Sequence, residues 1–212
     1  ISPFVIGATV IAFGTSAPEL AVALLASLEG KSELAMGNVI GSNIANIGLV
    51  LGLTALITPI AIAPDRLKRE APAFLLAALL ILGIAWDLQI NHFEGLLMVS
   101  LLGLYLWRAF NHKEGSVEEL EDEVPLFAGR SSLYQTLLII VGLVCLIGGA
   151  KLMVQGGVSI ARTFGISEWF IGITIVAIGT SLPEIVSSLI AAKRGHGEMA
   201  IGNIFGSNIF NI

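Results

Sequence analysis

The sequence predicts an all-α polytopic membrane protein whose two halves are inverted five-helix repeats with interrupted helices. Three observations lead to this prediction. Of the 212 residues, 55% are hydrophobic and only 13% are charged, whereas a soluble domain carries about 25% charged residues. The apolar residues gather in blocks long enough to cross a bilayer, which takes about 20 residues each. Finally, two distant blocks share the same order of polar residues.

About seven apolar blocks follow one another along the chain. They cover residues 4–28, 34–58, 71–87, 93–110, 132–161, 168–192 and an unfinished block from 198. We predict helices, because the alternation of apolar and polar residues that is typical of barrel strands is absent. The chain begins without a Met and stops inside an apolar block. We therefore expect a fragment containing about seven helices.

The charges predict how the chain is oriented and divided. Eight of the eleven Lys and Arg residues lie in the alternate loops at 63–70, 108–131 and 193–197. By the positive-inside tendency this side faces the cytoplasm. We expect a first repeat at 1–110 without its first helix, an acidic cytoplasmic loop at 111–131, and a truncated second repeat at 132–212. The expected location is the plasma (inner cell) membrane.

An internal repeat joins the two halves. Residues 7–47 align without a gap to residues 172–212, at a constant offset of 165, with 21 identities in 41 positions. Chance similarity between apolar helices would match Leu with Ile, but here Thr, Ser, Pro, Glu and Asn match themselves. The opening helix of the second copy is the fifth predicted helix after the opening helix of the first copy, and five is odd. The copies therefore run through the membrane in opposite directions, as in many secondary transporters.

Each copy carries a proline inside its first apolar block, in "GTSAPE" and "GTSLPE". Pro18 and Pro183 lack an N–H, so in a regular helix the carbonyls of Gly14 and Gly179 would lose their partners. An unpaired carbonyl in lipid costs several kcal/mol unless it lines a cavity or binds a cation. We expect each break to offer oxygen atoms to a ligand.

Polar side chains at helical spacing surround these breaks. Four-residue spacing places side chains on one helix face. In the first block of each copy the set is Thr15, Ser16 and Glu19, repeated as Thr180, Ser181 and Glu184. In the following block it is Asn38, Ser42 and Asn46, repeated as Asn203, Ser207 and Asn211. Glycines at 37, 41, 202 and 206 are expected to let another helix approach closely.

The chemistry of this set is narrow. Carboxylate, hydroxyl, amide and carbonyl oxygens are hard donors that suit Ca²⁺ or Na⁺ rather than Zn²⁺ or copper. Glu19 and Glu184 are the only acidic residues deep in apolar blocks. Burying each costs at least ~2.5 kcal/mol on insertion scales, so a functional role is the default. The plainer interpretations are helix packing by the small polar residues, or a structural ion pair between one glutamate and Lys151.

The motifs "GTSAPE" with "GNVIGSNIANI", and "GTSLPE" with "GNIFGSNIFNI", closely resemble the two alpha repeats of the sodium/calcium exchanger family, within the calcium/cation antiporter superfamily. The resemblance is strong over both copies of the repeat. It implies a fold of ten helices in two inverted five-helix halves. It also implies that the segment before residue 166 is the long gating helix of the family.

The resemblance further implies a set of ion ligands. Calcium is held by Glu19 and Glu184 with the main-chain carbonyls of Thr15 and Thr180. Sodium is held by serines and neighbouring carbonyls, here Ser16, Ser42, Ser181, Ser207, Ala12 and Ala177. Asn46 and Asn211 complete the central site. Some family members have Asp at the last position, where this chain has Asn.

We therefore expect a secondary active antiporter that exchanges Na⁺ for Ca²⁺ across a lipid bilayer by alternating access. We expect no enzyme activity, no cofactor and no nucleic-acid partner. The nearest alternative is an H⁺/Ca²⁺ antiporter, because a buried Glu can carry a proton. An intramembrane hydrolase is less favoured, since the sequence has no "HExxH" and no pairing of nucleophile with base. A passive cation channel is a further alternative.

Overall fold

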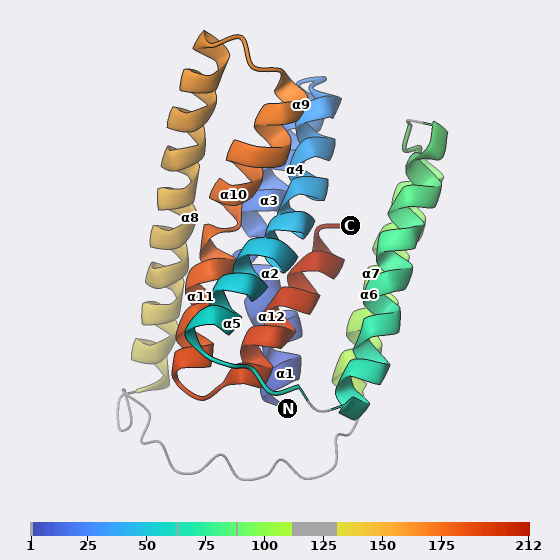
Figure 1. The fold of residues 1–212 in the computed structure, drawn as a ribbon. Helices are drawn as coiled ribbons and strands as arrows, with labels where there is room; N and C mark the ends of the chain where they lie inside the picture. The colour runs from blue at the N-terminus through green and yellow to red at the C-terminus, as the bar shows by residue number, and fades with distance from the viewer. Residues whose placement is uncertain (1, 63, 88, 112–130) are drawn as a thin grey trace.

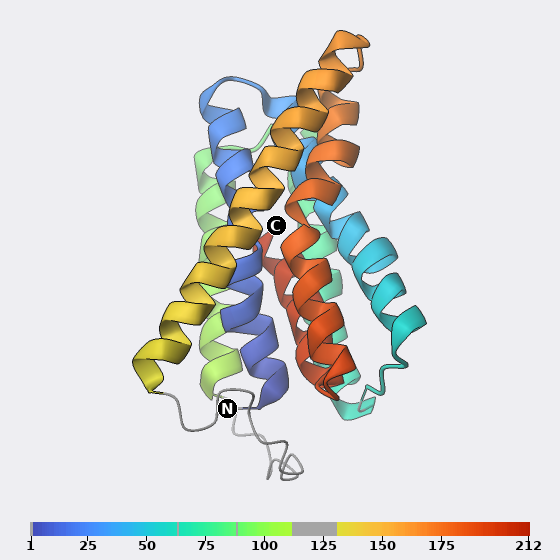
Figure 2. The same ribbon diagram turned by 90° about the vertical axis from the view of Figure 1, so that its left-hand side faces the viewer.

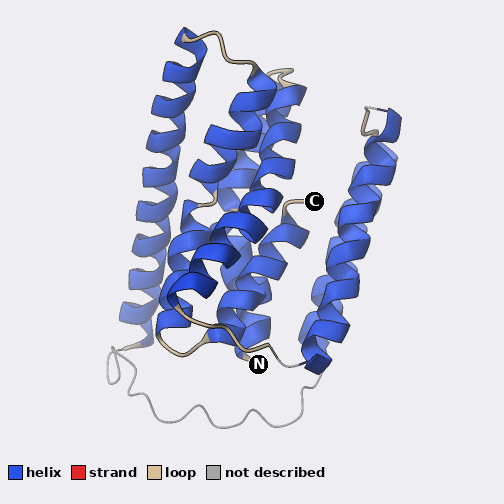
Figure 3. Cartoon of the chain, in the orientation of Figure 1, coloured by secondary structure: helices blue, strands red, loops and turns tan. Residues whose placement is uncertain are grey.

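The computed structural model describes residues 2–62, 64–87, 89–111 and 131–212. The described chain is built from helices joined by short loops, and no strand occurs in it (Figure 3). Six of its segments are long and apolar enough to cross a membrane, if the bent pair of helices at the N-terminus counts as one. A shorter helix, α12 (Gly197–Phe210), follows as a seventh segment. The all-helical membrane fold predicted from the sequence is confirmed.

The first segment is interrupted where the sequence predicts. It consists of α1 (Pro3–Ile6), the π-helical turn η1 (Gly7–Ile11), α2 (Ala12–Thr15) and α3 (Ala17–Leu28). The chain bends by 42° between α2 and α3. Ser16 at the break leaves helical geometry, with ψ near 2°, and Pro18 follows in the first turn of α3. A proline is tolerated there because a first-turn N–H has no helical partner to lose.

The second copy repeats this order of elements. It comprises α9 (Glu168–Ile171), the π-helical turn η4 (Gly172–Val176), α10 (Ala177–Thr180) and α11 (Leu182–Lys193). The two π-helical turns are separated by 165 residues, which is the offset of the sequence repeat. Figure 1 shows α1 at the bottom of the molecule and its counterpart α9 at the top. The two copies therefore run in opposite directions, as predicted.

The second helix of each copy packs against the first segment of the other copy. α4 (Ser32–Ala45) contacts α9 and η4, whereas α12 contacts α1 and η1. A Cβ added to Gly37 would lie 2.9 Å from the carbonyl oxygen of Trp169, and one added to Gly172 would lie 2.8 Å from that of Leu34. These helices therefore touch at backbone distance, and the packing role predicted for the glycines is confirmed.

Beyond Ala45 the helix of α4 continues through the π-helical turn η2 (Asn46–Leu51) into α5 (Gly52–Ile57). The whole segment spans residues 32–57, close to the predicted 34–58. Both η2 and α5 pack against α11, so the end of this segment of the first repeat contacts the second repeat. The interruption places Asn46 at the start of the π-helical turn.

A helical hairpin stands to one side of the repeats (Figure 1). It is formed by α6 (Pro64–Ile84), the 3₁₀ turn η3 (Ala85–Asp87) and α7 (His92–Asn111). The predicted start of this segment at residue 71 is wrong, because the charged residues before it are helical as well. Arg66 explains why: its guanidinium lies 4.8 Å from the ring centroid of Phe4 and 3.4 Å from Glu198, so these charged turns pack against the repeats.

The longest helix, α8 (Ser132–Thr163), crosses the other side of the molecule obliquely (Figure 2). It packs on α10, α11 and α3, with Val154 and Ala161 buried. Many of the large apolar side chains of α6, α7 and α8 are exposed, as expected for helices that face lipid. The acidic segment 112–130, predicted to be cytoplasmic, lies outside the described residues.

Candidate ion-binding site

The two helix breaks meet at the centre of the molecule, where the interior is polar. Ser16 and Ser181 occupy the breaks with nearly identical backbone angles, φ −82° and ψ 2° against φ −80° and ψ 4°. Glu19 and Glu184 follow in the first turns of α3 and α11, and both are buried, with 2% and 0% of their surface exposed. The positive end of a helix dipole therefore lies beside each buried carboxyl group.

Each carboxylate accepts a hydrogen bond from the serine of the opposite repeat. The hydroxyl of Ser16 donates to Oε1 of Glu184 at 3.0 Å, and that of Ser181 donates to Oε1 of Glu19 at 3.2 Å. The two bonds are related by the repeat offset. The structure thus brings together these four residues of the predicted ligand set.

The second oxygen of each carboxylate has no partner. Oε2 of Glu19 and Oε2 of Glu184 are buried without a hydrogen bond from any described residue. The interpretation of a structural ion pair with Lys151 is wrong, because the side chain of Lys151 is exposed and no salt bridge joins it to either glutamate. Two buried carboxylates without a cationic partner are costly, and a bound cation would offset that cost.

The threonines beside the breaks are linked across the repeats. The hydroxyl of Thr15 lies 3.2 Å from Oδ1 of Asn203, and that of Thr180 lies 3.2 Å from Oδ1 of Asn38. Each threonine hydroxyl also lies 3.3 Å from a main-chain carbonyl three residues earlier, that of Ala12 or Ala177. The same carbonyls accept the N–H of Ser16 at 2.9 Å and of Ser181 at 3.0 Å.

Two further asparagines belong to the site. Asn38 and Asn203 fall outside the ligand set implied by the resemblance, yet the structure joins them to Thr180 and Thr15. Both are almost completely buried. Their four-residue spacing from Ser42 and Ser207, present in both copies, is the sequence signal that marks them as part of the same helix face.

The serines of the second helices also contact the polar cluster. Oγ of Ser42 lies 3.4 Å from Oγ1 of Thr180, and Oγ of Ser207 lies 3.5 Å from Oδ1 of Asn203. Neither serine has exposed surface. Both hydroxyls thus belong to the buried polar cluster without adding charge to it.

Asn46 lies at the start of η2, which packs on α11 and α12, and Asn211 follows α12 and lines the same cavity as Ser16. Both carboxamide groups are buried, and neither has a hydrogen-bond partner among the described residues. No hydrogen bond between described residues joins either amide to the glutamates or to the rest of the cluster. Buried amides without partners are rare in proteins, which favours a ligand at this point.

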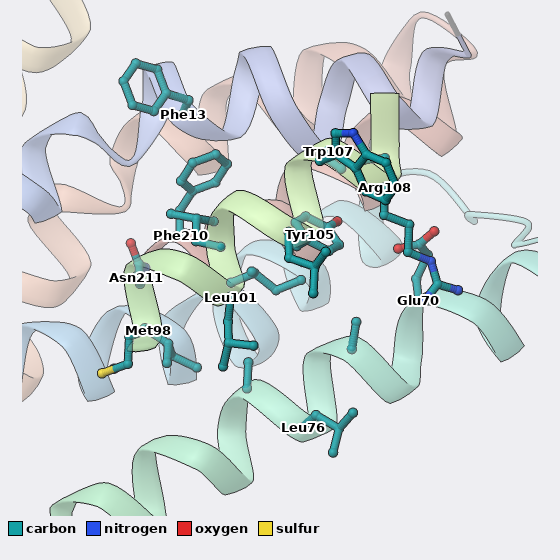
Figure 4. Close-up of a pocket in the computed structure, with 18 of the residues that line it drawn as sticks. Phe13, Glu70, Leu76, Met98, Leu101, Tyr105, Trp107, Arg108, Phe210 and Asn211 are labelled. Atoms are coloured by element: carbon teal, nitrogen blue, oxygen red, sulfur yellow. The ribbon is translucent and has the colours of Figure 1, made fainter. Parts of the chain in front are cut away.

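Two cavities approach the cluster. One of about 1110 Å³ lies between the α6–α7 hairpin and the repeats and is lined by Ser16, Phe13, Phe210 and Asn211 (Figure 4). The other, of about 590 Å³, lies between α3 and α8 and reaches Thr180. The described residues contain no group of three or more His, Cys, Asp or Glu side chains arranged to hold a metal. The chemistry is therefore that of two carboxylates surrounded by neutral oxygens, which suits weakly held, exchangeable hard cations.

Comparison with known proteins agrees with this geometry. Residues 1–111 and 134–212 match the family described as "Sodium/calcium exchanger protein". The chain is 41% identical to the putative antiporter CaxA of Alkalimonas amylolytica, matching 100% of this chain and 68% of that protein. It is 34% identical to the sodium/calcium exchanger MaX1 of Methanosarcina acetivorans, matching 100% of this chain and 71% of that protein.

Solved structures give the same result. The sodium/calcium exchanger from Methanococcus jannaschii superimposes with a TM-score of 0.76 at 39% identity, over 100% of this chain and 67% of that one. The H⁺/Ca²⁺ exchanger CAX superimposes with a TM-score of 0.69 over 99% of this chain and 60% of that one, but at 21% identity, which shows the shared fold alone. The chain is an integral membrane protein and belongs to the sodium/calcium exchanger family.

Proposed function

We propose that this protein is a secondary active antiporter that exchanges Na⁺ for Ca²⁺ by alternating access. The observation that carries the proposal is the pair of buried carboxylates, Glu19 and Glu184, each hydrogen-bonded by a serine of the opposite repeat and each left with one free oxygen. Two negative charges match one divalent cation or more than one monovalent cation. The ions would therefore compete for one region, and this competition couples their movements.

We assign the ligands as the resemblance to the sodium/calcium exchanger family implies. We assign calcium to the two carboxylates and the main-chain carbonyls of Thr15 and Thr180. We assign sodium to the flanking neutral oxygens, namely those of Ser16, Ser42, Ser181 and Ser207 and the carbonyls of Ala12 and Ala177. The unpartnered amides of Asn46 and Asn211 complete the set. The burial of these side chains and their mirrored arrangement support the assignment.

The electrostatics of the site suggest why exchange would be obligatory. An empty site leaves two carboxylates in a buried position, and moving such charges past an apolar gate is unfavourable. A bound calcium ion, or sodium ions in its place, would neutralise them and permit the transition. One cavity reaches Ser16 and the other reaches Thr180, so each helix break borders its own cavity.

An H⁺/Ca²⁺ antiporter is the second candidate. The observation that favours it is the free oxygen on each buried carboxylate, where a proton could be carried.

We propose the domain limits and the location that the sequence predicts. The repeats are at 1–110 and 132–212, the loop at 111–131 is cytoplasmic, and the protein is inserted in the plasma (inner cell) membrane.

Uptake of radioactive calcium by the purified protein in vesicles tests the proposal. We expect an outward sodium gradient to drive uptake at clamped pH, and no uptake beyond equilibration when the sodium gradient is absent. Uptake driven equally well by a pH gradient without sodium would reject sodium coupling and support the proton alternative. Calcium flux that is independent of any opposing gradient would identify a channel.

A further inference from the structure

The two repeats differ in the polar groups that surround their asparagines. The residues following Glu19 on α3 include Val22 and Ala23, and the residues at the matching positions on α11 are Ser187 and Ser188. The other polar residues of the cluster are identical in the two copies. These two serines therefore break the symmetry of an otherwise mirrored site.

In the first repeat the asparagine is held by the backbone. Nδ2 of Asn38 donates directly to the carbonyl oxygen of Glu19 at 3.1 Å, while Oδ1 accepts from the hydroxyl of Thr180 at 3.2 Å. The side chain at the position of Ser187 is Val22, which packs against a small apolar cluster that includes Ala26 and Leu34.

In the second repeat the asparagine is held by hydroxyls. Nδ2 of Asn203 donates to Oγ of Ser187 at 3.0 Å and to Oγ of Ser188 at 2.9 Å. The hydroxyl of Ser187 in turn donates to the carbonyl oxygen of Glu184 at 3.2 Å. Ser187 thus lies between the amide of Asn203 and the carbonyl of Glu184. The counterparts of these two groups, in Asn38 and Glu19, form a direct hydrogen bond in the first repeat.

We propose that Ser187 and Ser188 are positioning residues that set the cation affinity of the Thr15 side of the site. They act through Asn203, whose Oδ1 faces the hydroxyls of Thr15 and Ser207. The proposal rests on the function proposed above, because it concerns the affinity of that same site.

Asn203 depends on both serines because its carboxamide has two N–H bonds, and each of them needs an acceptor. The serines offer an acceptor for each of them, which fixes the plane of the amide and the direction in which Oδ1 points. Ser188 has no exposed surface and Asn203 has 1%, so water does not replace a lost partner. The Thr180 side depends on no such hydroxyl, and the two sides of the site therefore respond differently to loss of the serines.

An isosteric pair of variants tests this inference. Ser187→Val removes the hydroxyl and introduces the residue that the first repeat carries, whereas Ser187→Thr has the same shape as Val and keeps the hydroxyl. Apparent affinities for Na⁺ and Ca²⁺, maximum exchange rate and melting temperature are measured for each. We expect Ser187→Val to weaken the apparent affinity for at least one cation about fivefold, since one buried hydrogen bond is lost, with the maximum rate near the wild-type value. Ser187→Thr should retain the wild-type affinities.

A double-mutant cycle distinguishes positioning from packing. Ser187→Val combined with Thr15→Val should be non-additive in cation affinity, because both act through Asn203, whereas the combination with Thr180→Val should be additive. Ser188→Ala should show the same pattern. Equal affinities in the Ser187→Val and Ser187→Thr proteins, or additivity with both threonines, would overturn the inference.

Cation binding to the purified protein, measured by calorimetry, separates this inference from the proposed function. If the wild-type protein shows no exchange in vesicles, the proposed function fails, and the binding isotherms of the two variants still decide the role of Ser187. If exchange is present and the isotherms of the two variants are identical, the inference alone fails.

Discussion

The hydroxyl of Ser16 in the first repeat donates a hydrogen bond to the carboxylate of Glu184 in the second, at 3.0 Å. The mirrored bond joins Ser181 to Glu19 at 3.2 Å. Neither repeat therefore completes its carboxylate environment alone. A movement of one repeat against the other would change both bonds together, which places the two glutamates where a conformational change and ion binding can affect each other.

Replacement of either glutamate should nearly abolish calcium transport. Glu19→Gln or Glu184→Gln removes one of the two charges that we assign to the cation, and loss of a buried charged partner costs about 3 kcal/mol, or about a hundredfold. Calcium uptake into vesicles at matched protein density is the measurement. Near-normal uptake by either variant would reject the assignment.

The matched control for these variants is Glu33→Gln. Glu198 is unsuitable as a control, because it lies in the first turn of α12 and pairs with Arg66 at 3.4 Å. Glu33 occupies the equivalent position in the first repeat, is exposed, and has no salt bridge among the described residues. We expect its neutralisation to leave uptake at the wild-type level.

Loss of the neutral hydroxyls should affect sodium more than calcium. Ser42 and Ser207 are fully buried, beside Thr180 and Asn203 respectively, and add no charge to the site. We expect Ser42→Ala and Ser207→Ala each to raise the sodium concentration for half-maximal exchange about fivefold, with a smaller change in calcium affinity. Ser100→Ala, on the exposed face of α7, is the control. A larger effect on calcium than on sodium would assign these serines to the calcium site.

The close approach of the repeats predicts a steric effect at Gly37. A Cβ there would lie 2.9 Å from a main-chain oxygen of α9, so Gly37→Ala must push the helices apart. We expect it to lower the free energy of unfolding by about 1–3 kcal/mol, seen as a lower melting temperature in detergent. Gly48→Ala, where nothing lies within 4 Å, is the control. Equal melting temperatures for the two variants would contradict the observed packing.

The cytoplasmic side of the loop at 111–131 can be tested by labelling. In a Cys145→Ala background, which removes the single native cysteine, Ser116→Cys should resist an impermeant thiol reagent in intact cells and react after lysis. Gln89→Cys, in the loop between α6 and α7 that is expected on the other side, should react in intact cells. Labelling of Ser116→Cys from outside would reverse the topology.

The sequence alone determined the helical segments, the inverted repeat and the two central carboxylates. These features are encoded locally: apolar blocks define spans, an odd number of spans inverts the second copy, and the prolines mark both breaks. The start of α6 was predicted too late, at residue 71 instead of Pro64. A hydropathy pattern identifies only apolar residues, whereas the first turns of α6 are charged and pack on the repeats through the contact of Arg66 with Phe4.

Only the tertiary structure decided which groups meet across the repeats. Helical periodicity places Asn38 and Ser42 on one face, but it does not say which helix faces them. That choice follows from the crossing of α4 over η4 and of α12 over η1, where glycines bring the backbones together. The pairing of Ser16 with Glu184 depends on this three-dimensional crossing, whereas the contact of Ser187 with Asn203 depends on the packing of α11 on α12 within the second repeat.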